Sequence, residues 1–321
     1  MTEALLKTGR HTVTALTRAD SQSKLPDGVI VKPIDYNKLE TIVEALKGQD
    51  ALVIALNGLA PHGIDMMLIQ AAGNAGVPWI FPNEWSPDTA NEDLVKDVVV
   101  FQSKGKQQHY SVFAFCMEYI PNRSMSTGPT RKAIADLGKS SYIAVCTGFW
   151  YEWSLALPSA FGIDFAKRTV TLFDEGDAKV STSTWPQVGR TVAGLLSMPI
   201  KADGSNGACL ENLKNQVVYA DSFTVSQKDM LESAFRVTGT TEKDWTITKE
   251  PAKERYENGL KEMHQGDRIG FVKMLYTRIF FEDGAGNFES KGTLNGLLGL
   301  PKEDIDEATR VAIERSKNIT W

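Results

Sequence analysis

The sequence predicts an α/β protein: a doubly wound, Rossmann-like parallel sheet followed by a smaller α+β C-terminal subdomain. Short apolar segments alternate with amphipathic ones over the N-terminal half, which is typical of β-α-β units with right-handed crossovers. Residues 50–56 are apolar after the first position, as expected of a strand covered on both faces of such a sheet. An aromatic-rich segment begins after Gly148. We therefore divide the chain into residues 1–148 and 149–321.

The expected elements of the first part follow one another closely. Residues 1–9 read as the end of a helix that Gly9 terminates, since glycine often closes a helix. Strands are expected at 11–18, 29–35, 50–56, 77–81 and 141–146, and helices at 36–48, 66–75 and 129–138. Ligands of doubly wound sheets bind at the carboxyl ends of the strands. This edge is predicted to carry Arg18, Asn57, Gly58 and residues 81–84.

The second part, residues 149–321, alternates short strands and helices up to the end of the chain. Strands are expected at 169–173, 217–219 and 245–249, and helices at 185–197, 226–238 and 252–265. Some of these elements are expected to return to the sheet of the first part. We interpret residues 149–321 as the substrate subdomain and residues 1–148 as the nucleotide-binding domain.

Composition and charge exclude several classes of function. The net charge is −5 and the basic residues do not cluster, which argues against a nucleic-acid-binding face. No apolar run is long enough to span a bilayer and no signal peptide is evident, so we expect a cytoplasmic protein without membrane contact. The three cysteines and four histidines lack metal-ligand spacing, so neither a disulfide framework nor a metal site is expected.

Six strings occur in a characteristic order: EALLKTGRHTVTALTR, DALVIALNG, WIFPNEWSPD, SSYIAVCTGFWYEWSL, TSTWPQVGRTVAGLLSMP and DSFTVSQKDM. Together they resemble the NmrA-like / isoflavone reductase-like family of atypical short-chain dehydrogenases, in its fungal branch. The resemblance covers nearly the whole chain. It implies a Rossmann domain with a preference for NADPH (NADP as the oxidised cofactor) and a small C-terminal subdomain. It also implies one of two functions: reduction of a small aromatic or polyketide-type metabolite, or nucleotide sensing by a non-catalytic regulator or interaction protein.

The candidate cofactor-binding residues lie at the predicted strand ends. Arg18 ends a strand where dinucleotide-binding domains test for a 2′-phosphate, and its guanidinium would form a fork with that group. Lys24 is a weaker candidate in the following loop. Asn57, Gly58, Phe81, Pro82, Asn83 and Glu84 are expected to contact the nicotinamide ribose. The alternatives are solvated basic side chains and ordinary turn chemistry.

The candidate catalytic residue is Lys104, which the family resemblance implies. Family reductases place a catalytic lysine at the start of a helix reading Lys-x-x-x-Arg-x-x-Ile. Lys104–Gly105 resembles its beginning and residues 129–134 its continuation. Such a lysine donates a proton to the product oxygen, although Lys104 is equally consistent with a surface lysine. Residues 106–128 would be a genuine loop insertion or a retained intron read in frame; without rearrangement, Thr127 and Lys132 are the alternatives.

The start of the chain departs from the family pattern. Members carry a strand and a Gly-x-x-Gly-x-x-Gly turn before the segment that matches residues 3–7, and this sequence does not. We therefore expect a sheet that lacks its first strand, and weak or absent NADPH binding. Direct pairing of the strands at 12–17 and 51–56 could recover part of the stability that the absent strand would supply. An inactive reductase and a mispredicted gene product that lacks an upstream exon are both consistent with this expectation.

Aromatic residues gather just after the predicted domain boundary. Phe149, Trp150, Tyr151 and Trp153 are candidates for the lining of a substrate pocket. A packed core beneath the second subdomain is the other interpretation, because clustered aromatic side chains more often serve packing. A small-molecule substrate is the expected partner, and the chain is expected to be a monomer or homodimer.

Overall fold

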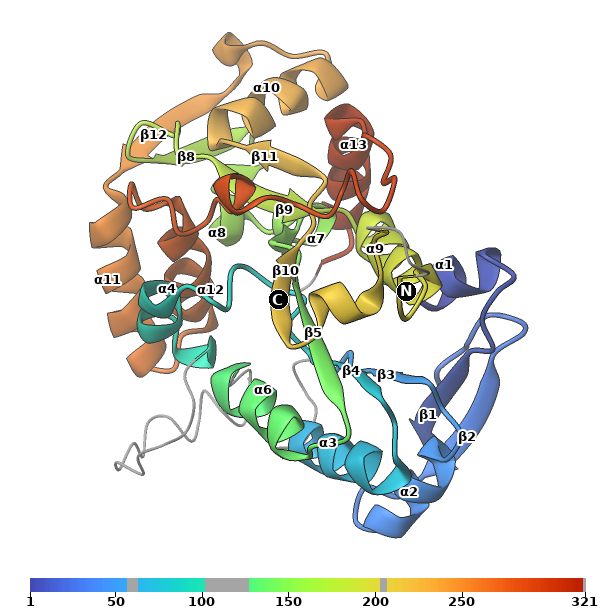
Figure 1. The fold of residues 1–321 in the computed structure, drawn as a ribbon. Coiled ribbons are helices and arrows are strands. Elements are labelled where there is room, and N and C mark those ends of the chain that lie inside the picture. Colours follow the sequence, from blue (N-terminus) through green and yellow to red (C-terminus); the bar gives the residue numbers. More distant parts are fainter. Residues whose placement is uncertain (57–62, 102–126, 203–206, 320–321) are drawn as a thin grey trace.

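The computed structural model describes residues 1–56, 63–101, 127–202 and 207–319. Helices cover both faces of a parallel sheet, and a second part built of helices and small sheets lies beside it (Figure 1). The predicted α/β class with a parallel sheet is confirmed. No helix of the described ranges combines the length and apolarity needed to cross a membrane.

The main sheet contains β3 (Ala51–Val53), β4 (Trp79–Phe81), β5 (Ser141–Cys146) and β10 (Gln216–Tyr219). The spatial order is β10-β5-β4-β3 and every pairing is parallel. Strands β1 (Thr14–Arg18) and β2 (Ile30–Ile34) form a separate parallel pair. Within the described ranges β1 and β3 are not paired, so direct pairing of these two strands does not make up for the absent strand.

Alternate side chains of the main sheet point into two helical layers, because successive residues of a strand face opposite sides. Trp79 and Phe81 pack in one hydrophobic cluster with residues of α1 (Thr2–Lys7) and α9 (Trp185–Ser197). Ile80 packs on the opposite face against α2, α3 and α6. The bounds of these three helices are Leu39–Leu46, Ile64–Ala75 and Thr127–Asp136. All three residues of β4 are buried, as expected of a central parallel strand.

The second part encloses its own hydrophobic cluster, rich in aromatic rings. Its two small sheets have the orders β11-β9-β6 and β12-β8-β7. The strands are β6 (Phe149–Trp150), β7 (Ile163–Asp164), β8 (Thr169–Phe173), β9 (Val180–Ser183), β11 (Phe223–Val225) and β12 (Thr246–Glu250). The helices are α7 (Tyr151–Ser154), α8 (Pro158–Phe161), α10 (Gln227–Thr238), α11 (Ala252–His264), α12 (Arg268–Thr277) and α13 (Ile305–Ser316).

Segments cross between the two parts in both directions. Leu94 of α4 (Glu92–Asp97) packs into the aromatic-rich cluster of the second part, whereas β10 pairs with β5 of the main sheet. Short 3-10 helices complete the fold: η1 (Val99–Phe101), η2 (Leu210–Leu213), η3 (Glu242–Asp244), η4 (Arg278–Phe280) and η5 (Glu289–Lys291). The division near residue 148 stays a prediction.

Several observed elements differ from the expected ones. The apolar run at 50–56 forms a strand only over Ala51–Val53, and both end residues are half-buried. The first strand begins at Thr14 rather than at residue 11. The helices α12 and α13 were not expected, nor were the strands β9 and β11. The sequence predicts an element less well where burial on several sides removes the one-face periodicity.

Candidate functional site

The segments that follow β3 and β4 are tied to each other at the carboxyl edge of the sheet. The Nε1 atom of Trp85 donates to the Ile54 carbonyl at 2.8 Å. The Asn83 Oδ1 atom accepts from the Leu56 amide at 3.3 Å. The predicted site residues Asn57, Gly58 and Lys104 lie outside the described residues. Phe81 is the last residue of β4, and Pro82, Asn83 and Glu84 follow it at this edge.

The segments after β4 and β5 are held together through Gly148. The amides of Thr147 and Gly148 donate to the Ser86 carbonyl at 3.0 and 3.1 Å. Gly148 has a φ of +66°, and a Cβ atom there would lie 2.0 Å from the carbonyl oxygen of Ser181 in β9. A side chain is excluded at this position. The close approach therefore fixes the strand ends of the main sheet against the second part.

Glu84 places a buried carboxyl group at this edge. The residue is 1% exposed, and its Oε2 atom accepts from the Thr89 hydroxyl at 2.5 Å. Its Oε1 atom lies 3.5 Å from the Arg131 Nε atom but accepts no hydrogen bond from the described residues. Burial raises the pKa of Glu84 to about 7, against the opposing effects of Arg131 and Thr89. This carboxyl group can therefore gain or lose a proton near neutral pH.

A second buried carboxylate, Asp88, lies on the same edge. It accepts from the Tyr219 hydroxyl at 3.1 Å and forms an ion pair with Lys291. The Lys291 ammonium also lies over the Tyr219 ring, 5.6 Å from its centre. Burial and the Asp88 carboxylate raise the pKa of Tyr219, so its hydroxyl stays protonated and acts as a donor.

We use the term strand-end cluster for the polar residues around these two carboxylates: Glu84, Asp88, Thr89, Arg131, Cys146, Tyr219 and Lys291. Burial raises the pKa of the Cys146 thiol to about 12, so this cysteine is an inert packing group. Of these residues only Glu84 was predicted. Arg131 could have been predicted, because it lies in the family helix motif. No local sequence pattern marks Tyr219 or Lys291.

The basic candidates of the nucleotide end lie on the surface. The Arg18 side chain is 63% exposed and forms an ion pair with Asp20 at 3.1 Å. Lys24 is also exposed. Tyr36 lies just after β2, where burial raises its pKa and the charge of Arg18 lowers it. An arginine and an aromatic ring therefore stand near each other at the carboxyl ends of the paired strands β1 and β2.

The four predicted aromatic residues do not share one environment. Tyr151 is fully buried and its hydroxyl lies 2.8 Å from the Thr309 hydroxyl. Phe149 stacks on Tyr276 with ring centres 4.1 Å apart. Trp150 and Trp153 both contact Trp185 at the start of α9. The structure therefore places Tyr151 in the core, while the other three are half-buried.

The alternative catalytic residues lie on α6. Thr127 is the first residue of this helix. Lys132 is exposed on the same helix and pairs with Asp136 at 2.7 Å. The structure thus gives Lys132 the environment of a surface ion pair.

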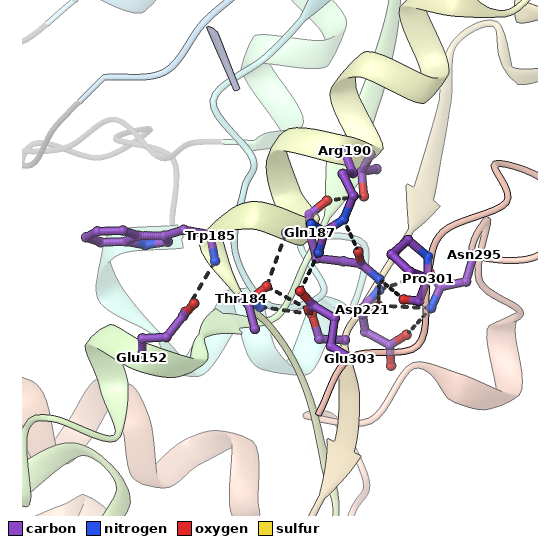
Figure 2. A network of polar contacts seen from close by, with 11 residues as sticks. Glu152, Thr184, Trp185, Gln187, Arg190, Asp221, Asn295, Pro301 and Glu303 are labelled. Carbon is purple, nitrogen blue, oxygen red and sulfur yellow. Dashed lines mark hydrogen bonds and ion pairs between the residues drawn. The ribbon is translucent and has the colours of Figure 1, made fainter. Parts of the chain in front are cut away.

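A separate polar network joins α9 to the segment before α13 (Figure 2). Glu303 accepts from the hydroxyls of Thr184 at 2.7 Å and Ser222 at 2.5 Å, and it pairs with Arg190. Gln187, Asp221 and Asn295 extend these contacts. We call these seven residues the Glu303 network. No group of His, Cys, Asp and Glu within the described ranges is arranged to hold a metal ion.

Residues 1–81 match a family model described as NAD(P)H-binding. Oxidoreductase aprR of Aspergillus flavus is 29% identical over 302 residues, which cover 93% of this chain and 89% of that protein. The matched segment contains β1 to β4 and hence most of the predicted cofactor-binding residues.

Solved structures support the same fold. A crystal structure of isoflavone reductase superposes with a TM-score of 0.67 at 18% identity, covering 96% of this chain and 93% of that one. An NADPH-dependent quinone oxidoreductase from Escherichia coli, solved with NADPH, gives a TM-score of 0.62 at 18% identity over 96% and 93%. The NAD(P)H-binding match over residues 1–81, the fungal oxidoreductase relative and the isoflavone reductase-like fold support the expected resemblance to the NmrA-like / isoflavone reductase-like family.

Proposed function

We propose that this protein is an NADPH-dependent reductase of a small, aromatic or polyketide-type metabolite. The observation that carries the proposal is Arg18, an exposed guanidinium at the carboxyl end of β1, inside the NAD(P)H-binding match. A basic residue at this position favours a nucleotide with a 2′-phosphate. Its ion pair with Asp20 is exposed and is worth at most about 1 kcal/mol, so a phosphate can displace it.

The residues beside Arg18 fit the same end of the cofactor. Tyr36 offers a half-buried ring close to the guanidinium, and such a ring can stack on a flat base. Lys24 lies in the loop after β1 and would add positive charge. The nicotinamide end would meet the carboxyl edge of β3 and β4, where we assign Asn57, Gly58 and residues 81–84 to the ribose.

The proposed chemistry is transfer of a hydride, which NADPH supplies when bound, and of a proton, which Lys104 supplies. Glu84 would hold a second exchangeable proton at this edge, since its pKa lies near 7. Two neighbours in structure are by name an isoflavone reductase and a quinone oxidoreductase, and both names denote flat conjugated compounds. This supports Phe149, Trp150 and Trp153 as the substrate-facing side, with Tyr151 as packing beneath them.

A titration of NADPH, followed by its fluorescence, tests the cofactor assignment. Replacing Arg18 with alanine should reduce the preference for NADPH over NADH by about tenfold, since one charge-assisted contact is lost. Lys7→Ala is a matched control, because Lys7 is an exposed basic residue on α1 and should leave the preference unchanged. A wild-type protein that does not distinguish the two nucleotides would overturn the assignment.

Oxidation of NADPH in the presence of 1,4-naphthoquinone or an isoflavone tests the reductase. Lys104→Met should abolish turnover and leave NADPH binding within about twofold, because the lysine acts on the reacting atoms. Lys132→Met is the control from the exposed face of α6. If NADPH binds but a broad panel of conjugated carbonyl compounds is not reduced, the protein is a nucleotide-sensing regulator instead.

A further inference from the structure

An open hollow of about 770 Å³ lies between α7 and the C-terminal end of α13. Its wall is formed by Trp153, Arg268, Val311, Glu314, Arg315, Asn318 and Ile319. This volume lies within the range of sites that bind small molecules. The hollow combines an aromatic face and two aliphatic side chains with two arginines, which is the composition of a site for an anion that is otherwise apolar.

Arg315 is held in a specific pose by two tryptophans. The central carbon of its guanidinium lies 4.1 Å from the centre of the Trp185 ring and 5.7 Å from that of Trp153. The two indoles are themselves stacked, with 23° between their planes. In Figure 2 the Trp185 indole points away from the Glu303 network. A guanidinium stacked on aromatic faces keeps its N–H groups directed outward along the plane.

One buried polar atom of Arg315 is unpaired within the described residues. Its Nε atom is buried and forms no hydrogen bond there, and none of the ion pairs in this part of the chain includes its guanidinium. The nearby Glu152 carboxylate accepts from the Trp185 amide at 3.2 Å. Burial raises the pKa of Glu152, and the positive charge of Arg315 opposes this rise. A buried donor without an acceptor is costly, so a bound anion would be stabilised here.

The other carboxylate of the hollow, Glu314, is already engaged. It accepts from the Lys317 ammonium at 2.6 Å, and both side chains are largely exposed. Arg268 adds a second positive charge to the wall. The wall thus contains two arginines and one carboxylate that is paired with Lys317.

We propose that this hollow binds a planar aromatic carboxylate, with the carboxylate on Arg315 and the ring along Trp153. A carboxylate matches the fork of a guanidinium, and Val311 and Ile319 provide the apolar contact that an aromatic ring requires. The site is built from residues of the second part alone and shares only Trp153 with the proposed substrate-facing side. The inference therefore holds whether or not the chain uses NADPH, and its test needs no nucleotide.

Calorimetric titration of the full chain with 2-naphthoate and with the neutral 2-naphthamide tests the proposal directly. The carboxylate should bind at least about tenfold more tightly than the amide, because only the carboxylate forms charge-assisted hydrogen bonds with Arg315. Equal binding of the two compounds, or binding of neither at millimolar concentration, would overturn it. Inorganic phosphate that displaces naphthoate at equal concentration would also overturn it, because the aromatic ring would then contribute nothing.

Variants locate the carboxylate. Arg315→Gln should weaken naphthoate binding about tenfold and leave naphthamide binding nearly unchanged, whereas Arg315→Lys should fall between, since an ammonium lacks the fork. Arg310→Gln is the matched control, because Arg310 is an exposed arginine on the same helix that pairs with Glu307. If Arg315→Gln and Arg310→Gln bind naphthoate equally, Arg315 does not hold the carboxylate. If Arg315→Gln does not fold, two measurements still test the proposal: naphthoate binding by Arg315→Lys, and the comparison of naphthoate with naphthamide in the wild-type protein.

Discussion

The strand-end cluster and the Glu303 network differ in how completely their buried polar atoms are paired. Both oxygens of Glu303 are engaged, one by Arg190 and the other by the hydroxyls of Thr184 and Ser222. In Glu84 one oxygen accepts from Thr89, while the other lies 3.5 Å from the Arg131 Nε atom and accepts no hydrogen bond within the described ranges. Buried polar groups are ordinarily satisfied. The Glu303 network therefore has a structural role. The incompletely paired carboxylate of the strand-end cluster points to a functional role for that region.

The contrast is physical rather than a matter of composition, because both regions contain carboxylates, an arginine and hydroxyls. A satisfied network contributes stability and fixes the position of α9. A partly satisfied one lowers stability, and such costs are tolerated most often where binding or catalysis needs the group. The following substitutions test this difference between the two regions. The first replaces Gly148, which lies against Ser181 of β9.

Gly148→Ala should destabilise the protein by more than about 3 kcal/mol, since a positive φ and a steric overlap add together. The new Cβ atom would lie 2.0 Å from the Ser181 carbonyl oxygen, which forces the strand ends away from β9. Gly138→Ala is the matched control, because Gly138 also has a positive φ but no atom within 4 Å of such a Cβ. It should cost only about 1 kcal/mol. Urea unfolding measures the stability of both variants. Equal losses of stability would show that Gly148 does not pack closely against Ser181.

Glu84→Gln should change how stability depends on pH. Burial raises the pKa of Glu84 from 4.5 to about 7, so the folded state binds the proton more tightly than the unfolded state. The resulting stability is complete below pH 4.5 and is lost as the pH rises to about 7, amounting to about 3 kcal/mol. The glutamine mimics the protonated form and should retain that stability at pH 8.

Urea unfolding at several values between pH 4.5 and 8 measures this effect. Asp136→Asn serves as the control, because its carboxylate is 61% exposed on α6 and its replacement should leave the pH profile of the wild type in place. A Glu84→Gln protein whose stability falls as steeply with pH as the wild type would show that Glu84 is charged throughout. The strand-end cluster would then be an ordinary buried ion pair.

The sequence predicts the fold where the pattern is local. The expected bounds of β5 and α9 agree with Ser141–Cys146 and Trp185–Ser197, because an apolar run and an amphipathic face carry enough information. The helix α12 was missed, since apolar residues lie all around it. Its Gly270 packs so closely on α11 that a Cβ atom would lie 2.4 Å from Glu262. Contact of this kind depends on another element and leaves no periodic pattern.

The candidate site was predictable only in part for the same reason. The segment after β4 could be placed at the carboxyl edge, because strand ends follow from the order of the elements. The partners of Asp88 come from far along the chain: Tyr219 lies 131 residues away and Lys291 203 residues away. Only the packing of β10 beside β5 and the return of η5 bring them there. A sequence pattern cannot reveal such a cluster without the tertiary structure.

Glu303→Ala should cost about 2 kcal/mol, since it removes an ion pair with Arg190 and two hydroxyl contacts from a side chain that is 16% exposed. Combining Glu303→Ala with Arg190→Ala should give less than the sum of the two single losses, because the residues interact directly. Urea unfolding of the four proteins measures the coupling. The affinity for NADPH is expected to stay unchanged. If the folded variant bound NADPH more weakly, the Glu303 network would be part of the cofactor site.

Tyr219→Phe should have the smallest effect, about 1 kcal/mol, because it removes one hydrogen bond to a buried carboxylate that keeps its other partners. Asp88 would still accept from the Ala90 amide at 3.0 Å and pair with Lys291. Tyr151→Phe provides the comparison, since it removes a buried hydroxyl contact with Thr309 in the core of the second part. Thermal unfolding should show similar losses for the two variants. A loss of NADPH oxidation in Tyr219→Phe alone would assign that hydroxyl to the reaction, whereas equal activity in both would confine the functional part of the strand-end cluster to Glu84 and its neighbours.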